Sequence, residues 1–122
     1  DPKQSFHHIG TNGSLFVFEA PIDMLSYITF YPEHWQESSY VACCGTSALP
    51  VLEMIKRMNW VDTVYLCHDK AGHAASERVA VLLSEKGLAT KRLLSVKKDW
   101  NADLMDREDH KTEVSNECQS FC

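Results

Sequence analysis

The most constraining feature of this sequence is a regular alternation between short apolar runs and longer segments with helical spacing. The runs SLFVFE, SYVACC, VDTVYLC and LATKRLLS are short and contain residues that favour strands. Between them lie segments that begin near Pro21, Pro50 and Ala71 and carry apolar residues at helical intervals. Strands and helices that alternate at this period predict an α/β fold: a central, mostly parallel four-stranded sheet with helices on both faces.

We expect three regions along the 122 residues. Residues 1–14, with two glycines and two histidines, predict a poorly structured lead-in. Residues 15–105 contain the whole strand and helix pattern, and residues 106–122 form a polar tail that we expect to be frayed or packed only through a partner. The chain does not begin with Met, which favours a segment of a longer polypeptide.

Composition narrows the classes of function. No apolar run approaches the length of a membrane span, so we expect no membrane partner. The five cysteines include no C-x-x-C pair, and adjacent Cys43 and Cys44 lie in an apolar run, as thiols do in a reducing, cytoplasmic protein. The formal net charge of −5 excludes a generally basic surface, so any contact with nucleic acid depends on a local patch.

Two carboxylates follow predicted strands. Glu19 ends the first strand, and Asp69 lies just past the third. Ligands of parallel α/β sheets bind outside the carboxyl ends of the strands, so these side chains could share a cleft and hold Mg²⁺ together with substrate phosphates. The alternative is structural: Glu19 and Asp23 are acids near a helix start that the helix dipole favours, and Asp69 caps the helix near Ala71.

Three motifs add a resemblance to a known family. VFEAPIDMLSY, VYLCHDKAGHAA and VKKDWNADL, in this order, resemble motifs of the Toprim domain shared by bacterial primases, type IA and II topoisomerases and small nucleases. They are similar to the Toprim domains of primase-like proteins encoded on bacterial mobile elements, over roughly Leu15 to Leu104. The resemblance implies a Rossmann-like Toprim fold and phosphodiester or nucleotidyl-transfer chemistry that depends on Mg²⁺, with Mn²⁺ as the alternative ion. It also implies a parent protein in replication or plasmid transfer.

The resemblance assigns roles residue by residue. Glu19 falls on the family's glutamate, a general acid/base that also lies at the metal. Asp23 falls on the acidic or polar residue one turn into the next helix, and Asp69 on the second aspartate of D-x-D, which binds Mg²⁺. The residues that flank the same cleft are Lys70, Gly72, Asp99 and Asn101.

Cys67 departs from the family pattern, because it replaces the first aspartate of D-x-D. A thiol is a poor Mg²⁺ ligand. The site is therefore degenerate, or Asp23 and Asp99 compensate, or the preferred metal is softer. Zinc is disfavoured, since Cys67 and His68 are neighbours on a strand and point to opposite faces.

Lys97, Lys98 and Trp100 are the best candidates for contact with nucleic acid. The lysine pair lies in the third motif, and an indole can stack on bases. We expect weak binding of DNA or RNA by this domain alone. The structural alternatives are a solvated lysine pair and a tryptophan that packs in the fold.

Two other functions stay open. The first is a catalytically degenerate Toprim module that acts as a nucleic-acid or protein interaction domain and contacts other domains of the parent protein. The second is an unrelated Rossmann-like nucleotide binder, which is disfavoured because no G-x-G-x-x-G follows the first strand.

Overall fold

The computed structural model describes the backbone of residues 6–43 and 47–120, and the side chains of residues 6–43 and 47–110. Residues 1–5 of the predicted lead-in and Cys44 lie outside the described residues. Within the described helices, none is long and apolar enough to cross a membrane.

The predicted alternation of strands and helices is confirmed. The elements are β2 (Ser14–Phe18), α1 (Pro21–Phe30), β3 (Ser39–Ala42), α2 (Leu49–Arg57), β4 (Thr63–Leu66), α3 (His73–Glu85), β5 (Ala89–Arg92) and α4 (Trp100–Ser120). β3, β2, β4 and β5 are parallel neighbours in that order. Gly87, directly after the last residues of α3, has a positive φ of 80°, a conformation that glycine adopts readily and that commonly ends helices.

Among the described residues, the sheet has five strands rather than the predicted four. The additional strand is β1 (Phe6–His8), which pairs antiparallel with β3 at one edge. It lies in the predicted lead-in, where its three residues, FHH, are partly or largely exposed and show no apolar alternation. Its order therefore comes from hydrogen bonding to β3, a pairing that local sequence does not encode.

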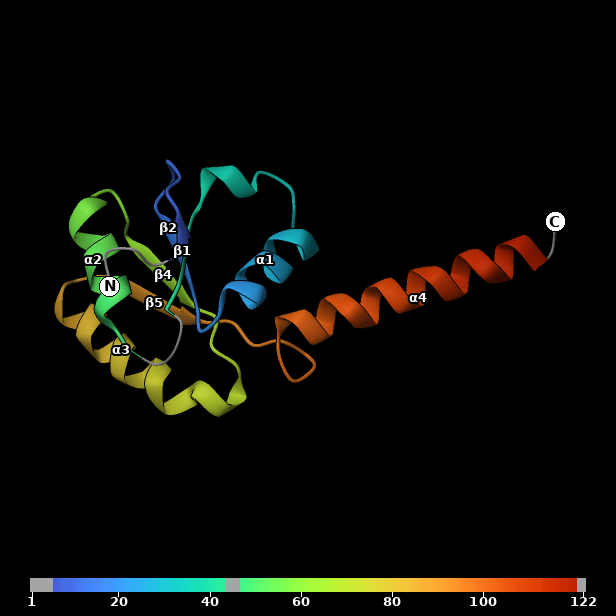
Figure 1. Ribbon diagram of the computed structural model, residues 1–122. Coiled ribbons are helices and arrows are strands. Elements are labelled where there is room, and N and C mark those ends of the chain that lie inside the picture. The colour runs from blue at the N-terminus through green and yellow to red at the C-terminus, as the bar shows by residue number, and fades with distance from the viewer. Residues whose placement is uncertain (1–5, 44–46, 121–122) are drawn as a thin grey trace.

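Helices cover both faces of the sheet (Figure 1). On one face an aliphatic core joins the strands to α2 and α3, with Val17, Val51 and Val79 among its buried members. On the other face an aromatic cluster joins the strands to α1 and the first turn of α4, and it includes Phe18, Tyr27 and Trp100. Adjacent strand residues alternate between the two cores, as the pleat requires.

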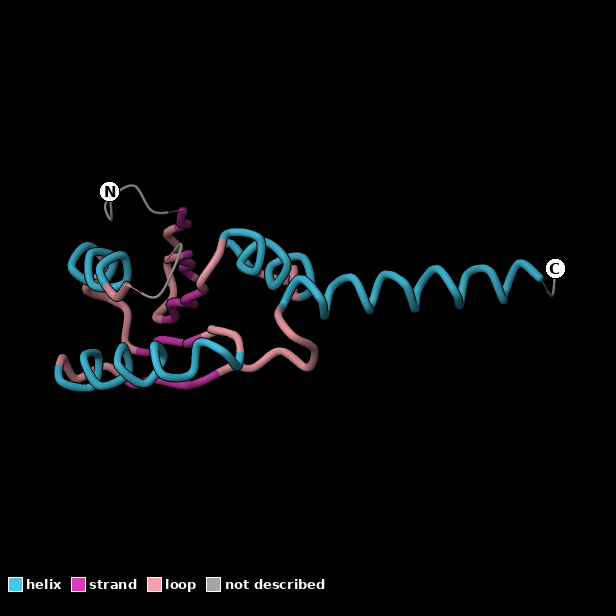
Figure 2. The backbone as a smooth tube through the Cα atoms, turned by 60° about the horizontal axis from the view of Figure 1, so that its bottom comes forward, coloured by secondary structure: helices cyan, strands magenta, loops and turns pink. Residues whose placement is uncertain are grey.

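The predicted frayed tail is instead the continuation of a helix. α4 runs from Trp100 to Ser120, and beyond its first turns it extends away from the rest of the molecule (Figures 1 and 2). The backbone after Asp106 is thus helical as far as Ser120, although the polar composition of this segment gives no apolar stripe that would reveal a helix in the sequence.

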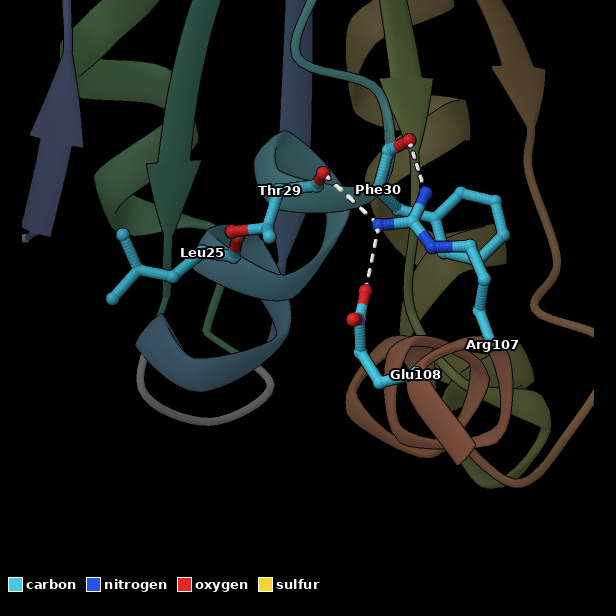
Figure 3. A network of polar contacts seen from close by, with 5 residues as sticks. All are labelled: Leu25, Thr29, Phe30, Arg107 and Glu108. Atoms are coloured by element: carbon cyan, nitrogen blue, oxygen red, sulfur yellow. Dashed lines mark hydrogen bonds and ion pairs between the residues drawn. The ribbon is translucent and has the colours of Figure 1, made fainter. Parts of the chain in front are cut away.

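α4 is attached to α1 through Arg107. Its Nη1 donates to the carbonyl of Phe30 at 2.9 Å and its Nη2 to the carbonyl of Thr29 at 3.3 Å (Figure 3). The guanidinium lies over the Phe30 ring, 4.2 Å from its centroid, and Nη2 also contacts Glu108 Oε1 at 3.4 Å. These contacts satisfy carbonyls at the end of α1 that have no partner within the helix.

Candidate functional site

Glu19 and Asp69 lie at the same edge of the sheet. β2 and β4 are adjacent and parallel, with Val17 opposite Leu66, and each carboxylate follows the end of its strand within three residues. Asp69 contributes to a raised pKa of Glu19, as two neighbouring negative charges require. The structure therefore brings together the two carboxylates that the motifs single out.

The Glu19 carboxyl group is held in a confined position. Its Oε1 atom is buried and has no hydrogen-bond partner among the described residues. Burial is the largest cause of its raised pKa, followed by the charges of Asp69 and Asp23, while Arg92 acts in the opposite direction. Gly72 lies directly against it, and a Cβ atom at this glycine would overlap Oε1. The glycine therefore provides the space that Glu19 occupies.

Asp69 also has a structural role. Its Oδ1 accepts a hydrogen bond from the Gly72 N–H at 2.9 Å, so it caps a short 3₁₀ turn, Lys70–Gly72, that leads into α3. Asp69 therefore caps the turn, as the structural alternative predicted, and also lies beside Glu19. Lys70 is exposed on the same turn.

Asp23 joins the group from the first turn of α1. Its Oδ1 accepts from the Asn101 N–H at 3.4 Å, and Asp99 caps α4 by accepting from the Ala102 N–H at 2.8 Å. Burial raises the pKa of Asp23 most, and the charge of Asp99 raises it further. The predicted flanking residues Asp99 and Asn101 therefore lie beside Asp23, where α1 and α4 begin.

Cys67 is buried in the aromatic cluster. Its side chain is 2% exposed and packs among residues that include Phe18 and Trp100. Burial raises the pKa of the thiol, so the side chain is neutral at pH 7. A neutral thiol in an apolar environment does not supply the negative ligand that an aspartate would give here.

The prediction that Trp100 contacts bases is corrected by its position. The indole is 7% exposed, meets the Tyr27 ring edge-on at 5.0 Å, and donates from Nε1 to the carbonyl of Cys67 at 3.0 Å. A side chain enclosed in this way presents no face on which a base can stack. Lys97 and Lys98 are exposed, so their side chains are accessible for contact with nucleic acid.

Two further polar residues lie in this region: Arg92, which the motifs did not include, and His68, which the second motif contains but to which no role was assigned. Arg92 Nη2 donates to the carbonyl of Asp69 at 2.8 Å and to that of His68 at 3.4 Å. His68 is buried, and burial, assisted by the positive charge of Arg92, lowers its pKa to about 4. Arg92 ends β5, but it lies inside the longer predicted strand LATKRLLS, so the rule that identified Glu19 and Asp69 did not select it from the sequence.

The donor set fits a hard cation only in part. Among the described side chains, no three His, Cys, Asp or Glu residues converge closely enough to hold a metal ion. Mg²⁺ does not need such a cage, because it retains waters and often uses one or two carboxylates plus phosphate oxygens. The unpartnered Oε1 of Glu19, beside Asp69 and Asp23, is an oxygen donor of this kind. The residues therefore fit a site that a substrate completes.

Comparison with known proteins agrees with the motifs. The family model described as Toprim-like matches residues 16–104. The crystal structure of the primase fragment of the bacteriophage T7 primase-helicase protein is similar, with a TM-score of 0.61 and 18% identity over 87% of this chain and 44% of that chain. No curated protein matches.

A second similar chain comes from the structure of bacteriophage T7 lagging-strand DNA polymerase interacting with primase domains of two gp4 subunits bound to an RNA/DNA hybrid and dTTP. It has the same TM-score of 0.61 and 18% identity, over 87% of this chain and 54% of that chain. This chain thus spans about half the length of these solved relatives.

Proposed function

This chain belongs to the Toprim-like family, and we propose that it is a nucleic-acid-processing domain with Mg²⁺-dependent phosphodiester or nucleotidyl-transfer chemistry. The observation that carries the proposal is the cluster of acidic side chains that follows the ends of β2 and β4. In this cluster, the Oε1 atom of Glu19 is buried and has no hydrogen-bond partner among the described residues. Such a group costs stability unless a cation offsets it, so its presence favours a ligand.

The chain's own residues divide the work. Glu19 is the general acid/base, because a carboxyl group with a raised pKa can hold and release a proton closer to neutral pH. Glu19 and Asp69 would hold the metal together with waters and phosphate oxygens, and Asp23 would add negative charge beside them, while Asp99 and Asn101 order the start of α4. Mg²⁺, or Mn²⁺ in its place, would supply charge neutralisation at a phosphate oxygen.

The chain is proposed to work inside a larger protein. Its solved relatives are about twice its length, and one of them is a primase fragment of a primase-helicase protein. We propose a primase-like or plasmid replication or transfer protein as the parent, in which other domains hold the DNA or RNA. Weak nucleic-acid binding and little activity are expected for this domain alone. A cytoplasmic location and a mobile-element origin belong to the same proposal.

The alternative is a catalytically degenerate Toprim module that binds nucleic acid or protein. The observation that favours it is Cys67, a buried neutral thiol at the position of the first family aspartate. The absence of three converging ligands among the described side chains points the same way.

Metal binding separates the two functions. Thermal unfolding of the chain should show stabilisation by millimolar Mg²⁺, because a ligand that binds the folded state raises its stability. Asp69→Asn should abolish this response, since asparagine keeps the cap to Gly72 but lacks the charge. Asp62→Asn is the matched control, because Asp62 lies just before the first residue of β4, at the end of the strand away from Asp69. A wild-type chain that does not respond to Mg²⁺ would reject the catalytic proposal in favour of the interaction module.

Restoring the family carboxylate gives a second test. Cys67→Asp should raise Mg²⁺ affinity in titration calorimetry, while lowering stability without metal, because a carboxylate in the aromatic cluster is poorly solvated. Cys67→Ser, which changes size little and adds no charge, should show no gain in affinity. Equal affinities for the wild type and Cys67→Asp would mean that this position takes no part in metal binding.

A further inference from the structure

A hollow of about 310 Å³ lies where α4 leaves the domain. Val96 and Lys97 line it from the segment between β5 and α4, Phe30 from the end of α1, and Arg107 from α4. Phe30 and Arg107 are the pair that joins these two helices (Figure 3). The volume is at the lower end of the roughly 300–1,000 Å³ of ligand pockets, so the hollow can receive one group of a larger ligand.

Val96 presents an apolar side chain at this hollow. It is 82% exposed, more than any other large apolar residue that the structure describes. Single exposed apolar residues are common on protein surfaces and need no explanation by themselves. Val96 differs in its neighbours, because it lines a hollow and is followed directly by two exposed lysines, Lys97 and Lys98.

The segment that carries Val96 is held against α4. Asp103, in the first turn of that helix, accepts hydrogen bonds from the Val96 N–H at 2.9 Å and from the Lys97 N–H at 2.6 Å. The buried Ser95 donates from Oγ to the carbonyl of Lys97 at 3.0 Å. The backbone is therefore ordered before any ligand binds, which reduces the entropy lost on binding.

The charges at the hollow favour an anionic ligand. Its two carboxylates have partners, because Asp103 accepts from the two N–H groups and Asp106 lies 3.8 Å from Nδ1 of His110. Neither Lys97 nor Lys98 forms an ion pair among the described side chains. The two ammonium groups therefore stay available beside an apolar surface.

A single-stranded nucleic acid combines apolar bases with anionic phosphates in this way. We propose that the hollow holds one unstacked base of a single strand, with Val96 and Phe30 against the base and Lys97 and Lys98 at the flanking phosphates. This inference rests on the proposed function and deepens it, since it names the residues that contact a base.

The position of the segment favours nucleic acid over an anionic membrane, which also combines apolar and negatively charged groups. Asp99 and Asn101 follow the two lysines directly, and Asp23 of the carboxylate site accepts from the Asn101 N–H. A strand bound at the hollow therefore lies close to the acids that would process it. The hollow also supplies the base contact that the enclosed Trp100 cannot make.

A pair of oligonucleotides tests the base contact. One is an oligothymidylate of about eight nucleotides, and the other is an abasic strand of the same length and charge. Both are titrated with the chain in a low-salt buffer with EDTA and followed by fluorescence anisotropy. The wild type should bind the oligothymidylate about fivefold more tightly than the abasic strand.

Substitutions at Val96 should change this preference and little else. Val96→Ser should reduce it to about twofold, with the affinity for the abasic strand unchanged, whereas Val96→Trp should increase it, because an indole offers a larger surface to a base. The melting temperature should hardly change, since the side chain is mostly exposed.

Two other variants serve as controls. Val81→Ser should leave both affinities unchanged, because Val81 is an exposed valine of α3 that does not line the hollow. Lys97→Gln should weaken both strands alike and keep the preference, since an ammonium group contacts phosphate rather than base.

Three results would overturn the proposal. They are equal wild-type affinities for the two strands, no binding of either strand at low salt, and an undiminished preference in Val96→Ser. Vesicles that contain phosphatidylserine replace the strands in a parallel titration. Vesicle binding that depends on Val96, without a preference for bases, would assign this surface to a membrane and reject the nucleic-acid ligand.

The EDTA keeps this result separate from the metal test. Loss of the Mg²⁺ response alone rejects the proposed catalytic function, and loss of the base preference alone rejects this inference.

Discussion

The carboxylate site and the Arg107 junction lie at opposite ends of α1 and use charge in opposite ways. At the junction, one guanidinium meets two main-chain carbonyls, a carboxylate and an aromatic ring, and only its Nε has no partner among the described residues. At the site, acids face one another, and Glu19 Oε1, with Arg92 Nε and Nη1 nearby, has no partner among the described residues. The junction therefore stabilises the fold, whereas the site costs stability in a way that a ligand would relieve.

Arg107→Ala should produce the largest loss of stability. It removes the charged hydrogen bonds to the carbonyls of Thr29 and Phe30 and the contact with the Phe30 ring, a loss of about 2 kcal/mol for a side chain that is 29% exposed. Urea unfolding measures it, and exposed Arg78→Ala is the control. The Mg²⁺ response should be unchanged. If Arg107→Ala kept its stability but was no longer stabilised by Mg²⁺, Arg107 would serve the carboxylate site rather than the stability of the fold.

Gly72→Ala should affect the site more than the fold. The new Cβ would overlap Glu19 Oε1 and lie 3.0 Å from His68 Cβ, so the carboxyl group would be displaced from its buried position at a cost of about 1 kcal/mol. The shift in melting temperature that Mg²⁺ produces should be lost. Gly13→Ala is the matched control, because its Cβ would meet Asp62 at the other end of the sheet. Retention of the full Mg²⁺ shift in Gly72→Ala would contradict the proposed position of Glu19.

The pH dependence of the free energy of unfolding should distinguish the carboxylate site from the Arg107 junction, with a smaller effect than the two substitutions above. A raised pKa in the folded state means that protonated Glu19 contributes stability below its unfolded pKa, and that this contribution is lost as the pH rises through the folded value. In EDTA, the free energy of unfolding of the wild type should therefore fall relative to Glu19→Gln as the pH rises from about 4. Arg107→Ala should lower the whole curve without changing this difference. A difference that grew in the opposite direction would reject the raised pKa.

Charge reversal at Lys97 and Lys98 should have the smallest effect on stability. Both side chains are exposed, and exposed charges contribute little, so the melting temperature of the double glutamate variant should hardly change. Weak, salt-dependent binding of single-stranded DNA should be lost. Lys56→Glu with Arg57→Glu, at the end of α2, is the control. If the Lys56 and Arg57 variant loses DNA binding and the Lys97 and Lys98 variant keeps it, the surface that contacts DNA does not include Lys97 and Lys98.

The sequence predicted the parts of this fold that local patterns encode. Four strands follow from apolar runs, and the placement of Glu19 and Asp69 follows from the rule that parallel strands end at one edge. Features that depend on distant contacts were missed. β1 exists through β3, and the burial of Trp100 depends on Tyr27 and on the carbonyl of Cys67.

α4 acts geometrically as a lever arm, because its first turn is held at the carboxylate site. Its 21 residues span about 30 Å at 1.5 Å per residue. The Asn101 N–H binds Asp23, and Arg107 holds the next turns against α1, so the fulcrum lies within the domain and the far end is outside it. The part of α4 beyond Arg107 is about 20 Å long, so a tilt of about 10° displaces its far end by about 3 Å. A small rearrangement among the acids would therefore be amplified at a distance.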